Sequence, residues 1–165
     1  MHIRVSIPSG FTLVESMTAV ALSALFLGSV FTMSISSIDA LRCAKEHVAA
    51  GQVLEQRIES LRIANWQEVT SPAWVAANIL NTDALGTAPL RNLSETLTLV
   101  PYRSTAVGDT TLTRSGGNTT IVNSTSLLTE NAVKVTWTLN FTGAPNNRSV
   151  TRQIVTILAQ GGVAK

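Results

Sequence analysis

The chain has one cysteine among its 165 residues, Cys43. A lone cysteine cannot form an intramolecular disulfide, so no such cross-link stabilises this protein. Catalytic motifs are equally scarce: there is no Gly-x-Ser-x-Gly elbow, no phosphate-binding loop and no dinucleotide fingerprint. Serine and threonine nucleophiles need an adjacent base, and His47 is the only histidine after the first ten residues. We therefore expect neither enzymatic activity nor a cofactor.

Charged residues are few, at 13% of the chain, and the two signs nearly balance, with 12 basic and 10 acidic side chains. The chain thus lacks the basic excess that marks nucleic-acid-binding proteins. Nucleic acid is not an expected partner.

No pattern of metal ligands is present. Cys43 and His47 are four residues apart, but a zinc site needs three or four ligands. Asp83, Asp109 and Glu130 are scattered, whereas calcium ligands are clustered. We expect no metal site, and we expect Cys43 to behave as a small, buried apolar side chain.

The dominant feature is an uncharged run of 23 residues from Ser16 to Ile38, which contains no proline. As a helix the run would be about 34 Å long. The hydrocarbon core of a bilayer is about 30 Å thick, so the run is long enough to cross it. Glu15 lies at the N-terminal end of the run, where a carboxylate entering lipid needs a partner. We expect a single membrane-spanning helix.

Small residues recur at every fourth position of this run, at Ala24, Gly28, Thr32 and Ser36. They would share one helix face, and small residues at this spacing let another membrane helix approach closely. Two interpretations remain open. The face is an assembly surface that packs against copies or relatives of the helix, or the run is a plain single-pass anchor.

The residues before the run resemble a known processing signal. Gly10, followed by Phe11-Thr12-Leu13-Val14-Glu15 and an uncharged helix, is similar to the class III signal of type IV pilins and type II secretion pseudopilins. The resemblance implies that a prepilin peptidase of the bacterial inner membrane cuts after Gly10 and methylates Phe11. Glu15 would then be the fifth residue of the mature chain, where it faces the N-terminal amine of a neighbouring subunit.

Two features depart from the family pattern. Pro8 and Ser9 precede Gly10, where a basic residue is usual, and Arg4 is the only Lys or Arg of the leader. One positive charge there still agrees with the positive-inside rule. The helix also lacks the proline that many major pilins carry midway, which makes the chain more similar to a pseudopilin or a minor pilin.

After Asp39 the chain becomes amphipathic, with apolar residues at steps of three and four. The apolar stripe consists of Leu41, Ala44, Val48, Gly51, Leu54, Ile58 and Leu61. The polar residues expected on the other faces are Asp39, Arg42, Glu46, Glu55, Gln56, Glu59 and Arg62. We expect one helix from Phe11 to Arg62, whose second part lays this stripe on a globular head.

The connector that follows contains Ser71-Pro72, which predicts the start of a short helix ending near Asn81. We expect Trp66 and Trp74 to pack this connector against the head. The predicted segments are a leader (1–10), a hydrophobic membrane or filament-core helix (11–38), its amphipathic continuation (39–62), the connector (63–94) and the head (95–165).

The head alternates between apolar and polar residues as antiparallel strands do. Strands are expected over residues 96–100, 110–114, 119–122, 133–141 and 149–158, with a hairpin turn at 115–118. On the 133–141 strand, Trp137 should face the helix near Leu54 or Ile58. The predicted fold class is α+β, with a long N-terminal helix packed on a small antiparallel sheet, as in type IV pilins.

Three functions of different classes are compatible with these features. The first, which the resemblance favours, is a structural subunit (a minor pilin or pseudopilin) of a type IV pilus or type II secretion filament. It would be anchored in the inner membrane with a periplasmic or extracellular head, and its partners would be other subunits and the prepilin peptidase. The second is a pilin-like membrane-anchored binding module for adhesion or DNA uptake. The third is a secreted enzyme with an ordinary signal peptide cut near Ser34 to Ser36.

Overall fold

The computed structural model describes residues 12–84, 86–103 and 108–161. The predicted leader, the cleavage position at Gly10 and the methylation position at Phe11 lie outside the described residues. The chain divides into two compact units, one ending at Ala40 and the other beginning at Leu41.

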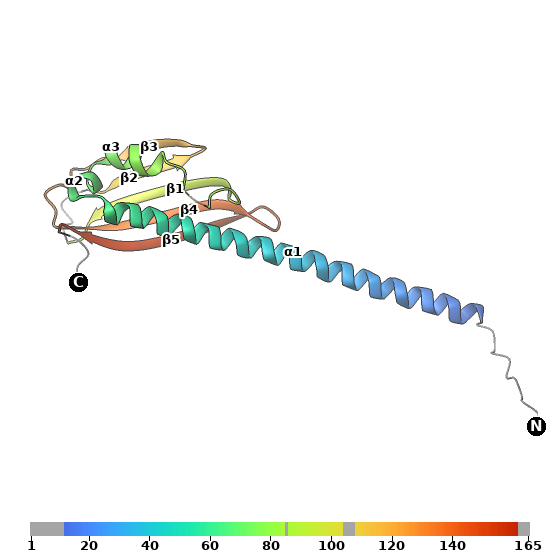
Figure 1. The fold of residues 1–165 in the computed structure, drawn as a ribbon. Coiled ribbons are helices and arrows are strands. Elements are labelled where there is room, and N and C mark those ends of the chain that lie inside the picture. Colours follow the sequence, from blue (N-terminus) through green and yellow to red (C-terminus); the bar gives the residue numbers. More distant parts are fainter. Residues whose placement is uncertain (1–11, 85, 104–107, 162–165) are drawn as a thin grey trace, which may run out of the picture. The chain divides into compact units, whose positions relative to one another are not determined.

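The first unit is the N-terminal part of helix α1 (Leu13–Ile63), drawn in blue in Figure 1. The helix begins at Leu13 because Thr12 caps it: the backbone N–H of Glu15 donates to Thr12 Oγ1 at 3.3 Å. Between residues 12 and 40 every side chain is exposed except that of Asp39, which is half-buried. The predicted helix is confirmed over its described part and ends at Ile63, one residue later than expected.

Several hydroxyl groups of this apolar segment are satisfied within the helix. Ser29, Thr32, Ser34 and Ser37 each donate to a carbonyl three or four residues earlier, at 2.6 to 2.9 Å. A hydroxyl bonded to its own helix does not need water, so these residues do not oppose insertion into lipid. By length and composition α1 is able to cross a membrane.

The second unit is built on an antiparallel sheet of five strands in the order β3-β2-β1-β4-β5 (Figure 1). The strands are β1 (Arg91–Pro101), β2 (Thr110–Ser115), β3 (Asn118–Asn123), β4 (Ala132–Gly143) and β5 (Arg148–Ala159). The α1 residues after Ala40 supply buried side chains to the same core as the inward-facing residues of the sheet. The predicted α+β fold class is confirmed.

Most strand positions agree with the sequence pattern. The hairpin between β2 and β3 turns at Gly116 and Gly117, whose φ angles of 57° and 83° are typical of a tight two-residue turn. β1 begins earlier than expected, at Arg91, because Arg91 pairs with Thr142 of β4 across an irregular stretch that ends at Ser94. The alternation that marks a strand is absent at such an irregularity.

The connector forms three short helical elements: α2 (Trp66–Val69), α3 (Pro72–Val75) and η1 (Ala76–Leu80). The predicted start at Ser71-Pro72 is confirmed, since the Ser71 side chain accepts from the backbone N–H of Trp74. Trp66 and Trp74 are half-buried against the core, and Trp66 Nε1 donates to the Leu128 carbonyl at 3.2 Å. Both tryptophans therefore pack the connector on the head, as expected.

The buried face of α1 differs from the predicted stripe. Leu54, Ile58 and Leu61 are buried as expected, but Leu41 and Val48 are 62% and 61% exposed. Two charged residues of α1, Glu46 and Arg57, are also buried. The buried residues of α1 are Glu46, Ala49, Ala50, Val53, Leu54, Arg57, Ile58 and Leu61. Hydrophobic periodicity misses a charged residue that is buried because a distant group satisfies it.

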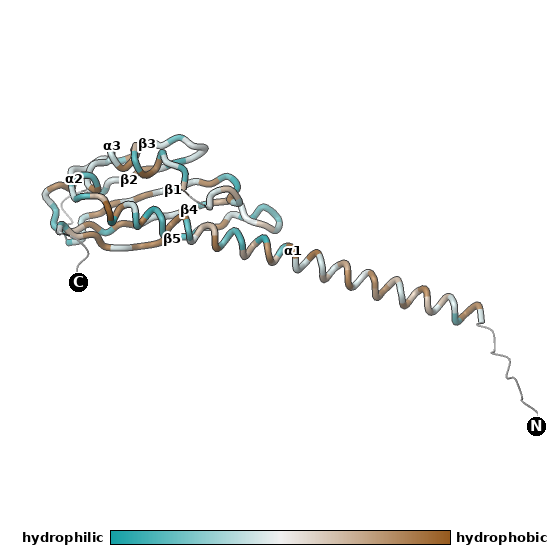
Figure 2. The backbone as a smooth tube through the Cα atoms, viewed as in Figure 1, coloured by the Kyte–Doolittle hydropathy of each residue, from teal (hydrophilic) through white to brown (hydrophobic). Residues whose placement is uncertain are grey.

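The hydropathy of the backbone changes along α1 in the same way (Figure 2). In the first unit the helix is mostly apolar or neutral, and in the second unit strongly polar residues alternate with apolar ones. The second unit also holds the core of buried apolar side chains. The helix is thus a single element whose first part has an exposed apolar surface and whose second part packs on a core.

Candidate functional site

The surface of the first unit contains the residues expected to act in assembly. Glu15, Ala24, Gly28 and Thr32 are all exposed. A Cβ atom added at Gly28 would meet nothing within 4 Å, and Thr32 Oγ1 is bonded to the Gly28 carbonyl at 2.6 Å. The helix surface at Gly28 therefore carries only small side chains, and the Thr32 hydroxyl is already hydrogen-bonded. Another helix could approach closely there without leaving the Thr32 hydroxyl group without a hydrogen bond.

Glu15 lies in the first turn of α1, next to the Thr12 cap. A carboxylate at this end of a helix interacts favourably with the positive end of the helix dipole. Its neighbours Val14 and Met17 are 68% and 65% exposed, so the carboxylate belongs to an apolar surface. Among the described residues, no basic side chain forms a salt bridge with Glu15.

An apolar surface continues on α1 in the second unit. The exposed side chains of Leu41 and Val48, with Ala44 between them, border a shallow depression of about 440 Å³. Gly86 and Pro89 of the connector form its other side. We call Leu41, Ala44 and Val48 the uncovered stripe. It is the part of the predicted apolar face that the head itself does not cover.

A buried ionic cluster holds the connector, α1 and the sheet together. Arg57 of α1 donates to Glu95 of β1 through Nε at 3.0 Å and Nη2 at 2.9 Å, and both side chains are almost fully buried. Arg57 Nη1 also donates to the Ile79 carbonyl of η1. Arg114 of β2 is a second donor to Glu95, at 3.0 Å. No local sequence pattern predicts this cluster, because its members are far apart in the chain.

Arg114 links this cluster to the surface. Its Nη2 donates to Asp83 at 2.7 Å, and the Asp83 side chain is 88% exposed. Burial opposes the charge of Arg114, but its hydrogen bonds to Asp83 and Glu95 outweigh that effect and raise the pKa of the guanidinium. A polar cavity of about 570 Å³ opens beside Arg114 and Glu95. Both residues are engaged with each other, which indicates a structural role.

Cys43 and His47 do share one side of α1, and both face strand β5. Arg148 Nη2 lies 3.0 Å from Cys43 Sγ, and Arg152 Nη2 lies 3.0 Å from His47 Nδ1. Cys43 is half-buried. The expectation of a buried apolar cysteine is therefore corrected: its thiol contacts a guanidinium, which an apolar environment would exclude.

The acidic residues considered as metal ligands lie apart. Asp83 is engaged by Arg114, and Asp109 accepts a hydrogen bond from Thr111 at 2.9 Å, which lowers the pKa of Asp109. Within residues 12–84, 86–103 and 108–161, no group of three His, Cys, Asp or Glu side chains is arranged to hold a metal ion. Comparison of the chain with protein-family models, curated proteins and solved structures gives no match.

Proposed function

We propose that this protein is a structural subunit of a pilus or secretion filament, of the minor-pilin or pseudopilin type. The observation that carries the proposal is the motif from Gly10 to Glu15 directly before an apolar helix that continues into a folded head. The motif resembles the prepilin signal, and the long helix followed by an antiparallel sheet is compatible with a pilin-like fold.

The exposed surfaces of α1 support assembly through this helix. In the first unit the apolar side chains have no partner in the described chain, and lipid or another helix would satisfy them equally well. The uncovered stripe is different, because it belongs to the head, beyond the apolar run. When a partner covers an apolar surface that is otherwise exposed to water, the complex gains about 25 cal/mol for each Å² of apolar surface buried. Neighbouring subunits would supply that cover.

In the proposed sequence of events, the unassembled subunit is held in the inner membrane by the run from Ser16 to Ile38. Prepilin peptidase removes residues 1–10 and methylates Phe11. The Phe11 amine and the Glu15 carboxylate are each unfavourable in lipid, at about 2–3 kcal/mol for a charge on insertion scales. Pairing the amine of one subunit with the carboxylate of the next lowers the cost of both charges in lipid. The pair forms at only one axial stagger of the two subunits, so it favours that stagger.

The mature N-terminus tests this proposal. Intact-mass measurement on the protein purified from a host that has prepilin peptidase should give a chain that starts at Phe11, with one added methyl group. A host without the peptidase should give the uncut chain. An N-terminus between Ser34 and Ala40 would instead identify an ordinary signal peptide and would overturn the filament proposal.

A further inference from the structure

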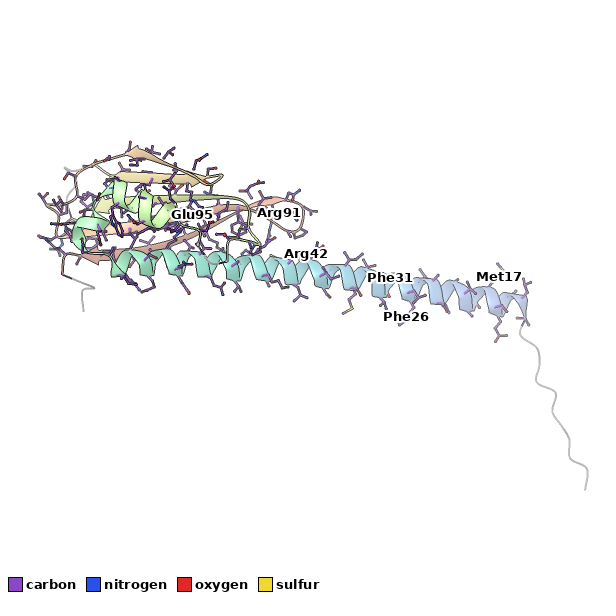
Figure 3. The ribbon with its side chains drawn as sticks, turned by 45° about the horizontal axis from the view of Figure 1, so that its top comes forward. Met17, Phe26, Phe31, Arg42, Arg91 and Glu95 are labelled. Carbon is purple, nitrogen blue, oxygen red and sulfur yellow. The ribbon has the colours of Figure 1, made fainter. Side chains whose placement is uncertain are left out.

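The end of the head that follows the apolar run is basic. Five positively charged side chains gather there, on α1, β1 and β5: Arg42, Lys45, Arg91, Arg148 and Arg152. All five are exposed. Figure 3 labels Arg42 and Arg91 at this end. Two acidic residues, Asp39 and Glu46, lie nearby in the sequence, and Glu46 is buried with its carboxylate accepting from the Ala144 backbone N–H at 2.9 Å.

Two of these arginines contact side chains other than carboxylates. Arg148 contacts the Cys43 thiol and Arg152 contacts the His47 ring, each through one Nη2 atom at 3.0 Å. No carboxylate of the described chain forms a salt bridge with either. A guanidinium has five N–H donors in a planar fork that matches the oxygens of a phosphate. Each side chain is therefore held by one contact while it remains exposed to solvent.

The chain length fixes how far these arginines can be from the apolar run. Cys43 and His47 follow Ile38 by five and nine residues. Five residues reach at most about 18 Å when fully extended, and a helical path is about 8 Å. The headgroup layer occupies about 5–8 Å on each side of the hydrocarbon core. With the run in a bilayer, this short connection allows the Arg148 guanidinium to reach lipid phosphates.

We propose that Arg148 and Arg152 bind the phosphates of anionic phospholipids and hold the head of the unassembled subunit against the membrane surface. The inference rests on the proposed membrane anchoring. Electrostatic attraction of a basic segment to an anionic surface is worth roughly a factor of five per charge at moderate salt, so the pair contributes about 30-fold to the ratio of docked to undocked heads. Salt weakens the contact because it screens exposed charges. Assembly then competes with this docked state.

The experiment uses the full chain in proteoliposomes. A fluorophore on Ser149→Cys, next to Arg148 in the sequence, in a Cys43→Ser background, reports proximity to lipids that carry a headgroup quencher. We expect stronger quenching in vesicles of phosphatidylcholine and phosphatidylglycerol than in phosphatidylcholine alone, and loss of the difference at high salt. Arg148→Gln with Arg152→Gln should lower the docked-to-undocked ratio about 30-fold. Arg62→Gln, which removes the charge of an α1 arginine that is paired with Glu59, is the control and should change nothing.

Each other outcome overturns the proposal. Equal quenching in the two lipids, or quenching that the double variant leaves unchanged, would show that the arginines do not dock the head. Release by inorganic phosphate beyond that of sodium chloride at equal ionic strength would identify a site for free anions. Quenching that depends on the protein-to-lipid ratio but not on phosphatidylglycerol would assign the arginines to a neighbouring copy. Vesicle flotation at high salt separately reports the membrane span, so failure of anchoring is distinguished from failure of docking.

Discussion

Arg57 and Glu95 form a two-point ion pair in the core of the head, with hydrogen bonds of 2.9 and 3.0 Å, although 38 residues separate them in the chain. The pair joins α1 to the central strand β1 at a place where neither side chain reaches water. A guanidinium buried in this way is tolerated only while its charge is compensated. Glu95 is also shared with Arg114, so its carboxylate serves two cations.

We therefore expect Glu95→Gln to be strongly destabilising. It leaves Arg57 charged and buried without its counter-ion, which costs about 3–5 kcal/mol in the free energy of unfolding. Arg57→Leu combined with Glu95→Leu should cost less than Glu95→Gln alone, because no buried charge remains unpaired there. Urea unfolding of the detergent-solubilised chain, followed by tryptophan fluorescence, measures both. Arg62→Gln is the control and should cost about 0–1 kcal/mol, since its pair with Glu59 is exposed. Equal losses for the single and double variants would contradict the charge argument.

Trp137 should be the most sensitive apolar residue of the sheet. It is fully buried, and the Arg57 guanidinium lies over its ring at 5.9 Å from the centroid, which confirms that it faces α1. Trp137→Ala should cost about 3–5 kcal/mol, as truncation of a buried aromatic does. Trp137→Phe is the matched control: the indole Nε1 has no hydrogen-bond partner in the described chain, so its loss removes no bond. A loss below about 1 kcal/mol for the alanine variant would contradict a core role.

The carboxylate of Glu15 should govern assembly and not insertion. Glu15→Leu removes a charge from the end of the apolar run, so the variant should be processed and inserted at least as well as the natural chain. It should nevertheless fail to join filaments efficiently, because no partner remains for the neighbouring amine. Its amount in sheared filaments or cross-linked envelopes, relative to its amount in membranes, measures this. Glu15→Asp keeps the charge and should retain part of the incorporation. Normal incorporation of the leucine variant would show that Glu15 does not act in assembly and interacts only with the dipole of its own helix.

The uncovered stripe should be dispensable for folding and required for assembly. Val48 is 61% exposed, so Val48→Glu should change the free energy of unfolding by no more than about 0.5 kcal/mol. The same change should reduce incorporation into filaments, since it places a charge where a neighbour is expected to cover an apolar surface. Glu55→Gln, at an exposed position of the same helix, is the control for folding and assembly. Unfolding that parallels the loss of assembly would show that Val48 stabilises the head itself.

The sequence alone determined the elements that depend on local patterns. The uncharged run predicts a helix of membrane length because it continues for 23 residues without a charge or a proline. Alternation predicts β4 because a sheet with one covered face imposes a period of two, and Val133 through Phe141 keep that period without a break. The turn at Gly116 and Gly117 and the start of α3 at Ser71 follow from residues whose backbone preferences are strong in any context.

Only the tertiary structure decided which residues of α1 are buried and which charges have partners. The predicted stripe included Leu41 and Val48, yet the core receives Glu46 and Arg57. Helical periodicity predicts burial from hydrophobicity alone, whereas a charged residue is buried only where a residue distant in the chain supplies a partner. That partner is the Ala144 backbone for Glu46 and the Glu95 carboxylate for Arg57. The contacts of Arg148 and Arg152 with Cys43 and His47 arise in the same way, because β5 returns beside a helix that is 105 residues earlier in the chain.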